Sequence, residues 1–168
     1  MGGTAAGARR PRLFEVDPDK LLDEGVAPWD VFPRPDKPLE EYTAKEVGTE
    51  GERLALVYLA RKGFQILDVN WRCRYGEADI VALDPKAEDT AVLVEVKTAL
   101  DLGRRDLVMP ELHVSRGKRD RYRRMGLQYL IDHAELETAR FDVVAVTILD
   151  ERLAKLRHLV GAFWGDGR

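Results

Sequence analysis

A helix-length stretch followed by three short apolar runs is the feature that most constrains the fold of this 168-residue chain. The stretch "TAKEVGTEGERLALVYLARKGF" spans residues 43–64, and Gly63 supplies a stop signal near its end. The run "FQILDVNWR" follows, and "YGEADIVALDPKAEDTAVLVEVK" holds two more runs rich in Val, Ile, Leu and Ala. Runs of this length and composition predict β-strands, and "DPKAEDT" is expected to form the turn between the last two.

A second helix and further strands are predicted later in the chain. The stretch "SRGKRDRYRRMGLQYLIDHAE", residues 115–135, predicts the helix, and "RFDVVAVTIL" and "AKLRHLV" predict the strands. The side chains expected on the apolar side of this helix are Tyr122, Met125, Leu127, Tyr129, Leu130 and Ile131. The order αβββαβ, with a further strand after it, predicts an α/β sandwich in which helices flank a mixed β-sheet.

Composition divides the chain into an arm, a domain and a tail. Six of the eight prolines lie in residues 1–44, which show little periodicity, so we expect an extended or poorly ordered arm there. One domain is expected over residues 45–164, with a short tail over 165–168. No apolar run approaches the roughly 18 residues that a membrane span needs. The single cysteine, Cys73, excludes an intrachain disulfide. We therefore expect a cytoplasmic protein without a membrane partner.

Two of the predicted strands carry charged residues within otherwise apolar sequence. Asp79 interrupts the first strand of the hairpin, and Glu95 and Lys97 interrupt the second. Because side chains alternate across a strand, Glu95 and Lys97 project from one face, roughly 6–7 Å apart. Hairpin pairing would bring Asp79 near them, since opposite residues lie within roughly 4.5–5.5 Å. Glu52, at the end of the apolar face of the first helix, would complete the cluster.

Converging carboxylates of this kind are stable where a cation neutralises them. Oxygen ligands without nearby His or Cys favour Mg²⁺ or Mn²⁺ over zinc. Such a cation leaves room for a phosphate oxygen and a nucleophilic water, and a nearby ammonium would orient that water and balance transition-state charge. These groups suffice to hydrolyse a phosphodiester. The alternative is a cross-strand ion pair between Asp79 and Lys97, with Glu95 solvated, and such surface pairs contribute only roughly 0–1 kcal/mol.

Several separated blocks of the sequence resemble a known family. The blocks are "EGERLALVYLARKGFQILDVNWRCRYGEADIVALD", "LVEVKTA", "RFDVVAV" and "HLVGAF", which together run from about Gly48 to Phe163. They resemble the uncharacterised YraN-like family, which is grouped with the PD-(D/E)xK endonucleases near the archaeal Holliday-junction resolvases. The resemblance implies a restriction-endonuclease-like three-layer sandwich with a mixed central sheet flanked by helices.

The resemblance also implies a role for each charged residue. Asp79, Glu95 and the backbone carbonyl of Val96 would bind the metal ion, with Glu52 as the acidic residue carried by the helix. Lys97 would assist the attacking water. The candidate catalytic residues are therefore Asp79, Glu95, Lys97 and Glu52, and the candidate metal ligands are Asp79, Glu95, Val96 and Glu52.

A basic segment lies between the predicted hairpin and the last strands, although the whole chain has a net charge of −3. Residues 104–124 hold eight basic and three acidic residues. Binding of a polyanion follows such a local patch more closely than it follows net charge. The candidate nucleic-acid contacts are Lys118, Arg119, Arg121, Arg123 and Arg124. The alternative is that these residues form only the solvated face of a helix.

Three functional hypotheses follow from these features. The first is a nuclease dependent on Mg²⁺ or Mn²⁺, an endonuclease that hydrolyses phosphodiesters in branched or structured DNA. The second is a catalytically silent nuclease-like module that binds nucleic acid or a protein partner. The third is a structural domain whose charges form a surface network. Because related resolvases act as dimers, the resemblance also makes a homodimer a candidate assembly.

Overall fold

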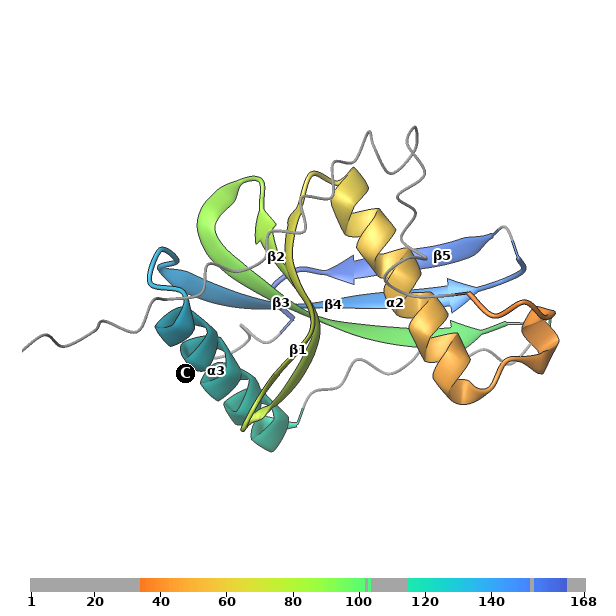
Figure 1. Cartoon of the computed structure of the whole chain (residues 1–168), viewed down its shortest axis with the longest axis horizontal. Coiled ribbons are helices and arrows are strands. Elements are labelled where there is room, and N and C mark those ends of the chain that lie inside the picture. The colour runs from red at the N-terminus through yellow and green to blue at the C-terminus, as the bar shows by residue number, and fades with distance from the viewer. Residues whose placement is uncertain (1–33, 102, 104–114, 152, 163–168) are drawn as a thin grey trace, which may run out of the picture.

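The computed structural model describes residues 34–101, 103, 115–151 and 153–162, and Figure 1 shows how its elements are arranged. In chain order they are the 3₁₀ helix η2 (Leu39–Glu41), α2 (Ala44–Arg61), β1 (Gln65–Cys73), β2 (Gly76–Asp84), β3 (Ala87–Leu100), α3 (Arg116–Asp132), β4 (Thr138–Ile148) and β5 (Ala154–Leu159). The strands form one sheet in the order β1-β2-β3-β4-β5, antiparallel except for the parallel pair β3 and β4. A parallel pair needs a crossover connection, and α3 lies within it. The predicted order αβββαβ, with its additional last strand, is confirmed.

One helix covers each face of the sheet, so the molecule has three layers (Figure 1). Helix α2 buries Leu56 against one face, and α3 buries Met125 against the other. Successive residues of β3 point to opposite cores: Val92 belongs to the α2 core and Leu93 to the α3 core. A central strand that is buried on both faces must be apolar at nearly every position, which explains the continuous apolar runs in the sequence. The predicted mixed-sheet sandwich is confirmed.

Helix α2 begins at a capping box. The Thr43 hydroxyl accepts a hydrogen bond from the Glu46 N–H at 3.3 Å, and the Glu46 carboxylate accepts one from the Thr43 N–H at 2.7 Å. Just before this cap, η2 places Leu39 in the core on the α2 side. The last part of the predicted arm thus contributes to the domain, whereas residues 1–33 and the predicted tail 165–168 lie outside the described residues. In the described ranges, no helix is long and apolar enough to cross a membrane.

The turn between β2 and β3 is shorter than the sequence predicts. We expected residues 84–90 to form it, but β2 ends at Asp84 and β3 begins at Ala87. The Asp84 carboxylate accepts a hydrogen bond from the Lys86 N–H at 2.8 Å, and this local bond closes the chain within two residues. The polar residues after Lys86 therefore extend the strand, although their composition is typical of a loop.

The side chains that helix α3 buries differ in part from the predicted apolar side. Tyr122, Met125 and Tyr129 face the sheet and are buried, but Leu127 and Ile131 are 62% and 74% exposed. At about 100° per residue, positions 127 and 131 point away from the side that carries the other three. The assignment of Leu127 and Ile131 to the buried side was wrong because the cluster of apolar residues in this helix is wider than the face that meets the sheet.

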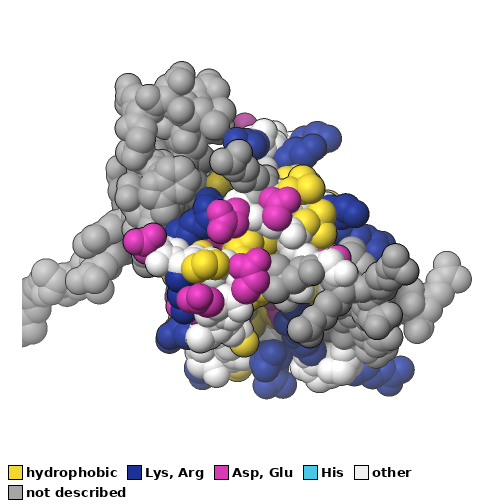
Figure 2. All heavy atoms as spheres, turned by 90° about the vertical axis from the view of Figure 1, so that its right-hand side faces the viewer, with side chains coloured by type: hydrophobic (Ala, Val, Ile, Leu, Met, Phe, Trp, Pro, Cys, Tyr) yellow, Lys and Arg dark blue, Asp and Glu magenta, His cyan; other side chains and the backbone are white. Residues whose placement is uncertain are grey.

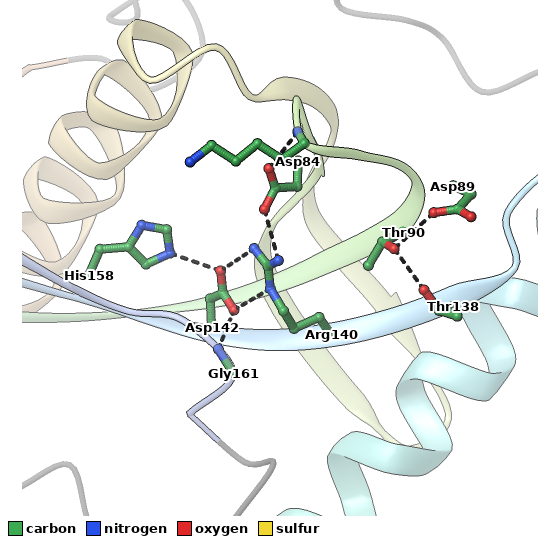
Figure 3. A network of polar contacts seen from close by, with 9 residues as sticks. Asp84, Asp89, Thr90, Thr138, Arg140, Asp142, His158 and Gly161 are labelled. Carbon is green, nitrogen blue, oxygen red and sulfur yellow. Dashed lines mark hydrogen bonds and ion pairs between the residues drawn. The ribbon is translucent and has the colours of Figure 1, made fainter.

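A buried ionic network ties three strands together on the α2 side of the sheet (Figure 3). Asp142 on β4 is fully buried and accepts two hydrogen bonds from Arg140, at 2.9 and 3.0 Å. Its carboxylate also contacts His158 Nε2 on β5 and the Gly161 N–H, each at 2.8 Å. Arg140 reaches Asp84 on β2 at 2.8 Å. Burial alone would raise the pKa of Asp142, but the hydrogen bonds from His158, Arg140 and Gly161 outweigh it and lower this pKa.

Replacing Asp142 by alanine is expected to lower the free energy of unfolding by about 3–5 kcal/mol, because Arg140 would remain half-buried without its bidentate partner. Urea denaturation at neutral pH, followed by circular dichroism, measures this change. A matched control is Asp120→Ala, which removes an exposed ion pair with Arg123 and should change stability by less than about 1 kcal/mol. Equal losses in the two variants would contradict a structural role for the network.

The same network predicts how stability depends on pH. Because folding lowers the pKa of Asp142, its contribution is present above the unfolded value of about 4 and is lost as the pH falls through the folded value. The stability difference between wild type and Asp142→Asn should therefore shrink as denaturation is repeated at successively more acidic pH. A difference that stays constant down to strongly acidic pH would show that the carboxylate charge is not what stabilises the strands.

Candidate active site

Strand pairing brings Asp79 next to the Glu95–Lys97 segment, as the hairpin predicts. Ile80 on β2 pairs with Val94 on β3, so Asp79 lies just beyond that pair. It is therefore beside the place in β3 where the apolar residues end and Glu95 follows. The Asp79 carboxylate accepts a hydrogen bond from the Val96 N–H at 2.7 Å. This bond fixes the carboxylate against the backbone of β3, one residue from Glu95.

Glu95 lies between two lysines. Its Oε1 atom contacts the ammonium groups of Lys97, on the same strand, and of Lys118, on α3, the latter at 2.7 Å. Its other oxygen, Oε2, is buried and has no hydrogen-bond partner within the described part of the chain. A buried carboxylate oxygen without a partner has lost its hydration, which is unfavourable unless another group binds there. Lys118, a candidate nucleic-acid contact that the family resemblance also placed near a helix lysine facing the site, is therefore a member of this site.

Helix α2 approaches the site closely because of a glycine. A Cβ atom placed on Gly51 would lie 1.7 Å from the Thr98 Oγ1 atom of β3, a distance that no side chain tolerates. The absence of that atom lets the helix backbone rest against the end of β3, and the next residue, Glu52, is brought toward Asp79. The short sequence "GE" thus combines a packing requirement with a functional side chain.

The carboxylates of the site respond to burial and to one another. Burial, together with the charges of Asp79 and Glu77, raises the pKa of Glu52 to about 7. Burial also raises the pKa of Asp79; the hydrogen bond from Val96 opposes this, whereas Glu95 and Glu77 add to it. Burial acts in the same direction on Glu95, but its bonds to Lys118 and Lys97 outweigh it and lower the pKa. The lysines of the site therefore compensate the charge of Glu95 fully enough to lower its pKa, whereas the effect of Lys97 on Asp79 does not prevent a raised pKa there.

These residues fit a hard divalent cation. Asp79 and Glu95 supply oxygen atoms, one of them buried without a partner, and such donors suit Mg²⁺ or Mn²⁺. Among the described residues, no three His, Cys, Asp or Glu side chains come close enough together to form a complete metal-binding group. The charges that raise the pKa of Glu52 are those of Asp79 and Glu77, and Glu95 is not among them. The N–H of Val96 binds Asp79, and the assignment of its carbonyl as a ligand stays a prediction.

The predicted nucleic-acid contacts on α3 divide into two groups. Arg121 and Arg124 lie beside the turn between β1 and β2, where Arg124 is over the ring of Tyr75 at 5.9 Å. Arg123 instead pairs with Asp120 on the same helix at 3.3 Å, and Arg119 is half-buried. Arg74, next to Tyr75, was not singled out from the sequence, although the short stretch "RCRYG" contains the signal.

Comparisons with known proteins assign the chain to a family without adding an activity. Residues 51–146 match the model of "Uncharacterised protein family UPF0102". A UPF0102 protein of Geobacter sulfurreducens is 42% identical over 120 residues, which cover 71% of this chain and 89% of the relative. A UPF0102 protein of Mycobacterium tuberculosis is 40% identical over 127 residues, 73% of this chain and 96% of the relative. The matched region contains the whole candidate site, from Glu52 to Lys118.

Replacing Glu52 by glutamine is expected to stabilise the protein by about 1 kcal/mol above neutral pH, because it removes a half-buried charge that Asp79 and Glu77 repel. Because the folded pKa of about 7 lies above the ordinary value of 4.5, the cost of this charge grows as the pH rises between the two values and is fully present above about 7. The gain should shrink as the pH falls below about 7 and vanish below about 4.5, where the wild-type side chain is protonated in both the folded and the unfolded state. Thermal unfolding at a series of pH values measures it, with the exposed Glu88→Gln as control. Equal effects in both variants would contradict the repulsion.

Proposed function

The chain belongs to the uncharacterised protein family UPF0102, the YraN family, and from the geometry of its acidic site we propose that it is a nuclease dependent on a divalent cation. The proposed reaction is hydrolysis of a phosphodiester by Asp79, Glu95, Lys97 and Lys118, with Mg²⁺ or Mn²⁺ as the cofactor. The observation that carries this proposal is the buried Glu95 Oε2 atom without a hydrogen-bond partner in the described structure, next to the fixed carboxylate of Asp79.

The carboxylates would hold the cofactor. Asp79 and Glu95 are the ligands that the geometry favours, and Glu52 is close enough to Asp79 for the Asp79 charge to raise the pKa of Glu52. A divalent cation bound there would supply Lewis-acid activation of the phosphoryl group and a nucleophilic water at neutral pH. Without such a cation, the same carboxylates would repel the negative charge of a phosphodiester. The dependence of the reaction on a cation therefore follows from the charge of the site.

The two lysines have different parts in the proposed reaction. Lys118 is less exposed than Lys97, with 26% against 44% of the side chain accessible, and its bond to Glu95 spans from α3 to β3. We assign Lys118 to holding Glu95 in its orientation. The more accessible Lys97 can turn from Glu95 toward a substrate, where its ammonium would orient the attacking water and stabilise charge developing on the phosphoryl oxygens.

The proposed substrate is DNA, in a branched or structured form, as the resemblance to junction resolvases implies. A homodimer would present two such sites to a substrate with two strands to cut, and the cytoplasm is the proposed location. The substrate and the homodimer extend the chemistry of the site by analogy with the wider superfamily, whereas the location is proposed from the composition of the chain. The chemistry itself requires only a phosphodiester and a divalent cation.

A second candidate function is a nuclease-like module that binds nucleic acid or a protein partner without cleaving it. The observation in its favour is that Glu95 is already neutralised by Lys97 and Lys118. The described residues also hold no complete group of three metal-binding side chains. In this case the lysines, with no metal ion, would satisfy the charge of β3, and the surrounding basic residues would supply the binding surface.

A cleavage assay separates the two candidates. Purified protein is incubated with linear, nicked and four-way DNA in the presence of Mg²⁺ or Mn²⁺. Asp79→Asn and Lys97→Ala should each lower the rate by at least about 100-fold, because several kcal/mol of transition-state stabilisation are lost. The exposed Glu88→Gln should cleave like wild type. Absence of cleavage with every substrate would favour the binding module, and cleavage that survives Lys97→Ala would point to a contaminating nuclease.

Metal binding is measured separately from cleavage. Calorimetric titration with Mn²⁺ should show one binding event in wild type that is lost in Asp79→Asn, because this substitution removes the charge of a ligand and keeps the side-chain shape. Excess Mn²⁺ should also raise the unfolding temperature of wild type and not that of the variant, since a ligand that binds only the folded state stabilises it. Equal heats in both proteins would contradict a metal site at Asp79.

A further inference from the structure

The turn between β1 and β2 and the middle of α3 form one basic surface around an aromatic ring. Arg74 lies over the ring of Tyr75 with its guanidinium carbon 4.6 Å from the ring centroid, and Arg124 of α3 lies over the same ring at 5.9 Å. Arg121 completes the group, since its Cδ atom is 3.6 Å from the position of a Cβ on Gly76. We call Arg74, Tyr75, Arg121 and Arg124 the arginine–tyrosine surface.

The three arginines of this surface have no carboxylate partner within the described part of the chain. Other arginines nearby do: Arg72 pairs with Glu77 at 2.9 Å, and Arg123 pairs with Asp120 at 3.3 Å. Cation–π contacts orient Arg74 and Arg124 on Tyr75, and Arg121 on Tyr122, but they leave the charges of the guanidinium groups uncompensated. Three like charges close together, two of them over the Tyr75 ring, are unfavourable in the free protein, so the arrangement favours an anionic partner.

The spacing of this surface suits an extended anion better than a single phosphate. Along α3, Lys118, Arg121 and Arg124 follow one another at intervals of three residues, each a rise of roughly 4.5 Å. Lys118 contacts Glu95, so this row begins at the candidate active site and leads away from it. Gly76, at the other side of the surface, is three residues from Asp79, roughly 10 Å along β2. A chain of phosphates could therefore contact the surface while one of them reaches the carboxylates.

The end of the molecule at which η2 lies carries acidic side chains with basic ones beside them. Figure 2 views the molecule from the end at which η2 and the start of α2 lie, and acidic side chains gather on this face. Glu40 and Glu41 of η2 are exposed there. Because Lys and Arg side chains lie beside these carboxylates, this end attracts a polyanion less than the arginine–tyrosine surface does, and that surface is the better approach to the site.

We infer that the arginine–tyrosine surface binds the phosphate backbone of a DNA strand and directs it across α3 toward Asp79 and Glu95. The guidance of the strand toward Asp79 and Glu95 rests on the proposed function, because it matters only if these residues cleave DNA. The binding of DNA itself requires neither a metal ion nor cleavage. Arg74, Arg121 and Arg124 contact phosphates, and Tyr75 holds two of the guanidinium groups in place. Trp71, the other aromatic residue of this hairpin, packs against Tyr129 at 5.1 Å and has no such role.

The test measures DNA binding with EDTA present, so that cleavage cannot contribute. Fluorescence anisotropy with a labelled DNA duplex compares wild type with the triple variant Arg74→Ala, Arg121→Ala, Arg124→Ala at several salt concentrations. The variant should bind at least about tenfold more weakly at moderate salt, and the slope of log affinity against log salt should decrease in magnitude by about 2–3, close to one per lost contact. The matched control removes three exposed cations elsewhere, Arg61, Lys155 and Arg157.

The outcomes separate this inference from the proposed function. A lower affinity and a shallower slope in the first variant, with the control close to wild type, support the inference even if no DNA is ever cleaved. Equal losses in the two variants would show that only net charge matters, and would overturn it. Wild type that fails to bind DNA would overturn it as well. A cation-dependent cleavage that persists in the triple variant with unchanged affinity would leave the nuclease proposal intact and remove this surface from it.

Discussion

The burial of β3 on both faces is the constraint on which the rest of the structure depends. This strand pairs with β2 on one edge and with β4 on the other, while α2 and α3 cover its two sides. Within that layer only apolar side chains can be accommodated, and from Ala91 to Val94 every residue is buried. Glu95 is the first position at which the covering helices leave space for charge. The location of the candidate site is thus set by where the double burial of the central strand ends.

Charge at this position must be stabilised by groups from several elements, since burial alone opposes it. The Val96 N–H holds Asp79, and lysines from β3 and α3 hold Glu95. Compensation remains incomplete, because the pKa of Glu52 is raised to about 7 and one oxygen of Glu95 lacks a partner in the described structure. The buried network around Asp142 is different, since each of its carboxylate oxygens is bound. The two ionic clusters of the sheet therefore differ in whether every buried oxygen atom has a hydrogen-bond partner. This difference distinguishes a site that can bind a ligand from one that stabilises strands.

Helix α3 connects the two functional proposals. One side of it contributes Tyr122, Met125 and Tyr129 to the core, and this packing fixes its orientation on the sheet. The fixed orientation in turn directs Lys118 to Glu95 and brings Arg124 over Tyr75. A crossover helix required by the parallel pairing of β3 and β4 thereby also supplies cations to the site and to the surface beside it.

The sequence by itself determined the order of the elements, the presence of helices flanking the sheet and the proximity of Asp79 to Glu95 and Lys97. These follow from periodicities of two and 3.6 residues and from short hairpin pairing, which act over distances that the chain geometry fixes locally. It misjudged Leu127 and Ile131, and it did not identify the bond of Lys118 to Glu95, the clustering of Arg74 with Arg124, or the contacts that join Arg140 to Asp84 and Asp142 to His158. Only the tertiary structure decided these, because they depend on how α3 is rotated against the sheet and on registers between strands far apart in the chain. Local periodicity carries no information about either.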